Sequence, residues 1–204
     1  MLLGILLIVL LSLAGYGYLA RETDRWKSKQ NGQNEFAILS QPVTLDSFLL
    51  LDENGDKVGV EALLGRWTLI TLGYTRCGEQ CPVTLVEGRE FLAGQKQANP
   101  SSPWQQVQAW MISLDPRHDQ PVQLREFMAP FKPEIVGLTG ASAALSRMVH
   151  FFSAGSRVVK MNHDGVPVIA HPSVWYLINP EGQWVAFAAG SHLAEISYMI
   201  LNKN

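Results

Sequence analysis

The residues from Trp67 to Tyr74 form an uncharged segment, rich in apolar and β-branched side chains, that leads directly into the chain's two cysteines. Such a segment predicts a buried strand. A helix is expected over residues 82–97, so Cys77 and Cys81 lie where the strand passes into the helix. Ligands of open α/β sheets bind beyond the carboxyl ends of the strands. The chain is thereby restricted to an α/β fold with a thiol pair at a position suited to a ligand.

The remaining apolar segments predict alternating strands and helices. Strands are expected over residues 106–114, 135–138, 173–178 and 184–188, and helices over residues 120–129, 141–152 and 191–201. Turn-forming residues at 52–56 and 179–183 predict a hairpin near each end of this region. The alternation in the middle implies a parallel core. We therefore predict an α/β, thioredoxin-like mixed sheet flanked by helices, with an N-terminal hairpin extension.

The N-terminal segment Leu2–Ala20 carries no charged side chain. As a helix it would span about 28 Å, close to the roughly 30 Å of a bilayer's hydrocarbon core. We predict a transmembrane anchor at residues 1–20. The alternative is a cleaved signal segment, which requires a basic start and a small-residue cleavage site. No basic residue precedes Leu2, and Tyr16, Tyr18 and Leu19 interrupt the small residues near the end of the segment.

A polar linker is expected over residues 21–40, followed by the folded domain at 41–204. Residues 21–29 hold four basic and two acidic side chains. By the positive-inside rule, these residues favour a cytoplasmic position for this end of the anchor.

The composition excludes several classes of protein. With 16 basic and 18 acidic residues, the net charge of −2 gives no basic footprint for nucleic acid. A hydrophobic fraction of 47% excludes a disordered chain. Two cysteines are too few for a disulfide-rich scaffold or a four-cysteine zinc site.

The cysteine pair is expected at the positive end of the helix. Pro82 suits the first helical position, so we predict that Cys81 caps the helix and that Cys77 lies in the preceding loop. The helix end and Arg76 favour thiolates there. A static disulfide, a redox couple and a metal clamp all remain open. Dithiol oxidoreductases usually have two intervening residues rather than three. Two thiolates favour Cu(I) and are also accepted by zinc.

His171 is the histidine best placed to join the thiols. It precedes the strand at 173–178, which in a thioredoxin-like sheet pairs beside the strand that ends at Tyr74. The imidazole would then complete a site of two sulfurs and one nitrogen. Met161 and His163 are reserve ligands, whereas structural or solvent-facing roles are expected for His118, His150 and His192.

Four segments carry a family resemblance: Gly73–Pro82 with its Cys-x-x-x-Cys-Pro, Ser113–Pro121, Gly137–Gly140, and His171 with Tyr176–Gly182. In this order they resemble the SCO/SenC family, copper proteins of cytochrome c oxidase assembly. The resemblance implies copper held by Cys77, Cys81 and His171, most readily as Cu(I), with Cu(II) as the alternative. It further implies an inner-membrane protein whose domain faces the periplasm, against the orientation favoured by residues 21–29.

The sequence departs from the family pattern beside the ligands. Arg76 stands where the family usually has histidine, and Gly78-Glu79 replaces Pro-Asp. Ala170 and Pro172 flank His171, so the family's preceding aspartate is missing. This aspartate is a potential partner of the ligand histidine, so its absence leaves the affinity for Cu(II) open.

The resemblance implies a copper chaperone that delivers copper to the dinuclear centre of oxidase subunit II. The alternative is a membrane-tethered thiol–disulfide oxidoreductase that keeps partner cysteines reduced, with Cys77 and Cys81 as its redox pair. A peroxidase of the same fold is a weaker third hypothesis, because Thr75 and Arg76 directly precede Cys77 instead of approaching it from elsewhere.

Overall fold

The computed structural model describes residues 36–78, 80–98, 100–152, 156–163 and 165–202 of the 204-residue chain. The strands are β1 (Phe36–Thr44), β2 (Leu49–Asp52), β3 (Lys57–Gly59), β4 (Thr68–Gly73), β5 (Gln108–Ser113), β6 (Ile135–Thr139), β7 (Arg157–Met161), β8 (Pro167–Ala170), β9 (Val174–Ile178) and β10 (Gln183–Ala189). The helices are α2 (Gln80–Ala98), α3 (Pro121–Met128), α4 (Ser142–Phe151) and α5 (Leu193–Asn202).

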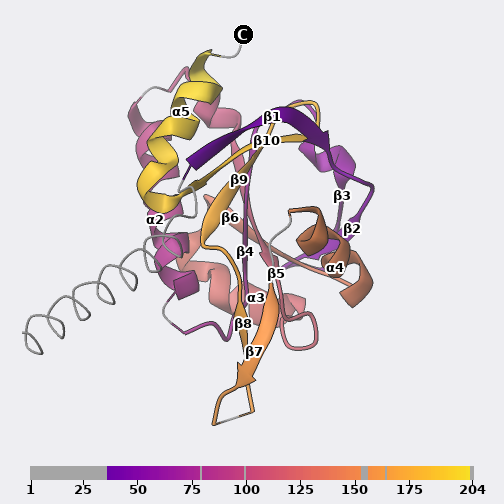
Figure 1. Ribbon diagram of the computed structural model, residues 1–204. Coiled ribbons are helices and arrows are strands. Elements are labelled where there is room, and N and C mark those ends of the chain that lie inside the picture. Colours follow the sequence, from indigo (N-terminus) through magenta and orange to yellow (C-terminus); the bar gives the residue numbers. More distant parts are fainter. Residues whose placement is uncertain (1–35, 79, 99, 153–155, 164, 203–204) are drawn as a thin grey trace, which may run out of the picture. The chain divides into compact units, whose positions relative to one another are not determined.

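An eight-stranded sheet runs in the order β1-β10-β9-β4-β5-β6-β2-β3 (Figure 1). The three strands β4, β5 and β6 are parallel, whereas β9 and β10 are antiparallel to their neighbours. The hairpin β2–β3 lies at one edge, where β2 pairs with β6. The predicted mixed sheet and its N-terminal hairpin are therefore confirmed.

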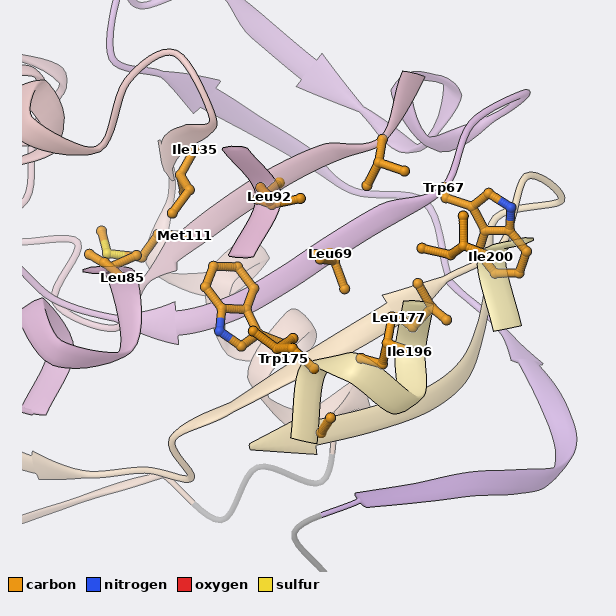
Figure 2. Packing of buried hydrophobic residues seen from close by; sticks show 14 of the residues in the cluster. Trp67, Leu69, Leu85, Leu92, Met111, Ile135, Trp175, Leu177, Ile196 and Ile200 are labelled. Atoms are coloured by element: carbon orange, nitrogen blue, oxygen red, sulfur yellow. The ribbon is translucent and has the colours of Figure 1, made fainter. Parts of the chain in front are cut away.

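One face of the sheet is covered by α2, α3 and α5. Alternate residues of the central strands point to this face, including Leu69 of β4 and Trp175 and Leu177 of β9. Leu85 of α2 and Ile196 of α5 pack against them (Figure 2). We call this cluster the α2-side core.

The opposite face is covered by α4 and by the segments on either side of the β2–β3 hairpin, which contribute Phe48 and Leu63. The intervening residues of the same strands, such as Ile70 and Tyr176, belong to this second cluster together with Leu145 of α4. Because both faces of β4 are covered, every residue of the strand is buried. This explains why its sequence is uncharged and mostly apolar.

Two strand segments depart from the sequence-based expectation. β1 begins at Phe36, inside the segment expected to be a linker up to residue 40, and it pairs with β10. The hairpin β7–β8 was not predicted, and it extends beyond the end of the main sheet (Figure 1). Most residues of β1 and all residues of β7 are exposed, so neither strand has the buried apolar pattern that identifies a strand.

The predicted anchor at Leu2–Ala20 lies outside the described residues. Within the described ranges, no helix is both long enough and apolar enough to cross a membrane.

The helix α2, which carries Cys81, is contacted at Gly88 by the side chain of Trp175 from β9. A Cβ atom at Gly88 would be 2.2 Å from Cζ2 of Trp175, a distance that no real contact allows. Trp175 is fully buried in the α2-side core and has no space to move into. Glycine at position 88 therefore lets the helix and the indole come together.

We predict opposite effects for two Gly→Ala substitutions in α2. Gly88→Ala should lower the free energy of unfolding by about 1–3 kcal/mol, because the added methyl group overpacks Trp175. Gly94→Ala should raise it by about 0.5–1 kcal/mol, because a methyl group there meets nothing within 4 Å and alanine favours the helix. Urea unfolding of both variants checks the prediction. Equal effects at the two positions would contradict it.

Candidate metal centre

The Cys77 thiol lies on the loop that follows β4. The backbone N–H of Cys77 donates a hydrogen bond to the carbonyl of Tyr74 at 3.1 Å, which turns the chain sharply after the strand. Glycine at position 73 avoids a tight contact at this strand end, because a Cβ there would lie 3.1 Å from Sδ of Met111. Cys77 is half-buried, as required for a sulfur that exchanges a ligand with solvent or a partner.

The Cys81 thiol is buried in the first turn of α2, which begins at Gln80. The prediction that Cys81 caps the helix is therefore wrong, because Cys81 is already the second residue of α2. Pro82 is tolerated inside this turn because the first N–H groups of a helix need no partner within it. Both cysteines are free thiols.

His171 lies between β8 and β9. The antiparallel pairing of β9 with β4 brings the start of β9 to the carboxyl end of β4, as predicted. Nδ1 of His171 contacts the carbonyl oxygen of Pro172 at 3.1 Å. Because a carbonyl can only accept, Nδ1 carries the hydrogen and Nε2 keeps the lone pair that binds a metal ion. Nε2 lies 3.5 Å from Sγ of Cys81.

The structure brings the three predicted ligands together. One ligand atom from each of Cys77, Cys81 and His171 lies within 4.8 Å of the other two. The reserve ligands Met161 and His163 are exposed on the hairpin β7–β8, and His163 does not belong to this cluster.

The remaining histidines also lie outside the cluster. His118 is half-buried in the loop after β5, and His150 is exposed at the end of α4. His192 contacts Glu195.

The two thiols differ in charge. A hydrogen bond from Cys81 is the main cause that lowers the pKa of the Cys77 thiol to about 4. The same hydrogen bond raises the pKa of Cys81, and burial adds to this shift. At neutral pH the apo pair therefore has one proton, held mainly at Cys81, and Cys77 is the thiolate.

Two buried aromatic residues, Tyr74 and Trp175, lie beside the site. Tyr74 is buried, its ring meets that of His171 edge-on at 6.2 Å, and its hydroxyl accepts a hydrogen bond from the N–H of Ile169 in β8. Trp175 is buried in the α2-side core. Neither aromatic contributes to an exposed docking patch.

A group of acidic residues near Cys77 was missed as part of the site. The buried carboxylates of Asp115 and Asp119 follow β5 and bind Arg76 and Thr75, the two residues before Cys77. The topology explains why they meet, because β4 and β5 are parallel neighbours and their carboxyl ends share one edge. The available sequence signal was Asp115, which directly follows the strand expected over residues 106–114.

The donor set suits copper. Two sulfurs and one imidazole nitrogen are soft and borderline ligands, which Cu(I) prefers and zinc also accepts. A structural zinc site closes with four protein ligands. Within the part of the chain that the structure describes, no fourth histidine, cysteine or carboxylate joins the group.

Comparisons with known proteins agree with this geometry. The human protein SCO2 homolog, mitochondrial, is 29% identical over 192 residues, which cover 93% of this chain and 71% of the relative. A putative copper-binding protein of Stutzerimonas stutzeri is 29% identical over 74% of this chain and 71% of its own length. Bradyrhizobium japonicum ScoI with copper bound superposes with a TM-score of 0.67 at 28% identity, covering 78% of this chain and all of that chain.

The solved ScoI structures that share this thioredoxin-like fold come from the same family as the sequence relatives. Arabidopsis thaliana ScoI with copper bound also has a TM-score of 0.67, at 25% identity over 76% of this chain and 94% of that chain. The sequence model of the SCO1/SenC family matches residues 38–203, which include all three clustered ligands. The chain belongs to the SCO1/SenC family.

Proposed function

We propose that this domain binds one copper ion, as Cu(I), through Sγ of Cys77, Sγ of Cys81 and Nε2 of His171. The observation that carries the proposal is the convergence of these three atoms within 4.8 Å. Binding replaces the proton held mainly at Cys81 by the ion. Three ligands leave one side of Cu(I) open, and the half-exposed Cys77 lies at that side.

The domain delivers this copper to the dinuclear copper centre of cytochrome c oxidase subunit II. Delivery proceeds by ligand exchange, in which a partner thiolate binds the ion before Cys77 and Cys81 release it. Membership of the SCO1/SenC family and the mitochondrial SCO2 relatives support this partner. The protein acts as a copper chaperone rather than an enzyme, because the copper ion is transferred without a change in its oxidation state.

The uncharged segment Leu2–Ala20 anchors the protein in the inner membrane as a single span, with the domain in the periplasm. Its length matches the hydrocarbon core of a bilayer. The basic residues at 21–29 oppose this orientation. The periplasmic side is proposed because the copper centre of the oxidase is assembled there.

We predict that the reduced full-length chain, in detergent and without oxygen, binds one Cu(I). His171→Ala should weaken binding by more than about tenfold, because it removes the only nitrogen ligand. Competition with a chromophoric Cu(I) chelator measures both affinities. His150→Ala is the control, because this exposed histidine at the end of α4 lies outside the cluster and its loss should change nothing. Equal affinities for wild type and His171→Ala would refute the three-ligand site.

A second candidate function is thiol–disulfide exchange. The asymmetry of the pair supports it, since Cys77 is a half-exposed thiolate and Cys81 is a buried thiol. Such an arrangement has one attacking sulfur and one resolving sulfur. Both functions require the reduced pair, so the same residues would serve either one.

The pH dependence of alkylation tests this asymmetry. Because the pKa of Cys77 is lowered to about 4, its reaction with iodoacetamide should be nearly constant from pH 8 to about 5 and fall only through pH 4. Mass spectrometry of the labelled peptides gives the rate for each cysteine. Cys81→Ser removes the thiol that is the main cause of the shift, so the fall should move to higher pH. A Cys77 profile centred near pH 9 in the wild type would count against the thiolate assignment.

A further inference from the structure

We propose that Asp119 is a positioning residue of the copper centre. Through Thr75 it fixes the loop that carries Cys77 at the separation from Cys81 and His171 that a shared ion requires. This inference rests on the copper-binding function proposed above, and it assigns a role to residues outside the ligand set.

The Cys77 loop needs such support because few hydrogen bonds restrain its backbone. The N–H of Cys77 makes one backbone hydrogen bond, to Tyr74 at 3.1 Å. On the downstream side, a Cβ atom at Gly78 would meet nothing within 4 Å. Cys81 is held differently, since it is buried in the first turn of α2. The two sulfurs are therefore carried by separate supports, and only that of Cys81 is a regular element.

Asp119 accepts hydrogen bonds from Thr75, two positions before Cys77, at both of its carboxylate oxygens. The N–H of Thr75 donates to Oδ2 at 3.1 Å, and the hydroxyl of Thr75 donates to Oδ1 at 2.5 Å. Asp119 is completely buried, so water does not compete for these oxygens. Hydrogen bonds to an ionised acceptor are about twice as strong as neutral ones. Two bonds from one residue fix its orientation as well as its position.

Ser113 also holds the carboxylate of Asp119 in place through a hydrogen bond. Its Oγ accepts the N–H of Asp115 at 3.0 Å, so its own hydrogen is free to be donated to Oδ2 of Asp119 at 2.6 Å. Asp115 in turn forms an ion pair with Arg76. The segment after β5 thus holds Thr75 and Arg76, the two consecutive residues that precede Cys77.

Loss of the Thr75–Asp119 hydrogen bonds has two consequences that can be measured separately. A freer loop lowers copper affinity, because Cys77 must then be ordered when the ion binds. The described pair is a dithiol, and a disulfide requires its sulfurs to approach to about 2.05 Å. A freer loop closes more easily, so the reduction potential of the pair becomes more negative. The second readout does not depend on copper.

The experiment is a double-mutant cycle in the full chain. Thr75→Val removes the hydroxyl donor and keeps the shape of the side chain. It should lower Cu(I) affinity about tenfold. It should also shift the reduction potential of the cysteine pair by about −30 mV, which corresponds to a tenfold change in the equilibrium constant of this two-electron couple. In the Asp119→Asn background, the same substitution should change affinity less than about twofold, because the partner carboxylate is already altered. Thr75→Ser retains the donor and should behave as wild type.

Glu53→Gln is the matched control. Glu53 is another buried carboxylate, ion-paired with Lys132 away from the thiols, so its variant should lower the unfolding midpoint and leave affinity and potential unchanged. A folded Thr75→Val with wild-type affinity and potential would overturn the proposal. So would equal losses in both backgrounds of the cycle. If the wild type holds no copper, the proposed function fails, and the shift in potential still decides the role of Asp119.

Discussion

The antiparallel pairing of β9 with β4 is the interaction on which the site depends. It sets Trp175 opposite Thr71, and the hydroxyl of Thr71 donates to the carbonyl of Val174 at 3.0 Å. A slip of one residue would turn Trp175 from the α2-side core to the other face of the sheet. It would also carry His171 about 3.3 Å along the strand, out of reach of the thiols. The packing of the core and the geometry of the ligands therefore require the same register.

The parts of the fold that could be predicted from the sequence are those with strong local signals. β4 is buried on both faces and therefore uncharged and mostly apolar, and the turn residues at 179–183 indicate the hairpin β9–β10. His171 could be singled out because it precedes a strand that a mixed sheet of this kind sets beside the thiols. In each case, a short stretch of sequence contains the information that decides the structure.

The parts that escaped prediction are decided by contacts between distant segments. β1 is an exposed edge strand and is defined by its partner β10 rather than by its own pattern. The hydrogen bonds between Thr75 and Asp119 join residues 44 positions apart, and they follow only from the parallel pairing of β4 and β5. The helix start at Gln80 was missed for a local reason, because Pro82 favours a later start but does not exclude an earlier one.

The histidine and the buried cysteine of the cluster are 90 positions apart in the chain. An unfolded chain cannot keep them together, so the complete chelate exists only in the native state. Any ion held by all three ligands then stabilises the fold by thermodynamic linkage, in proportion to the logarithm of its free concentration over its dissociation constant. A donor that gives up its ion to a partner also gives up this stabilisation. The loaded and empty proteins would then differ in their resistance to heat and proteases, with no change in architecture.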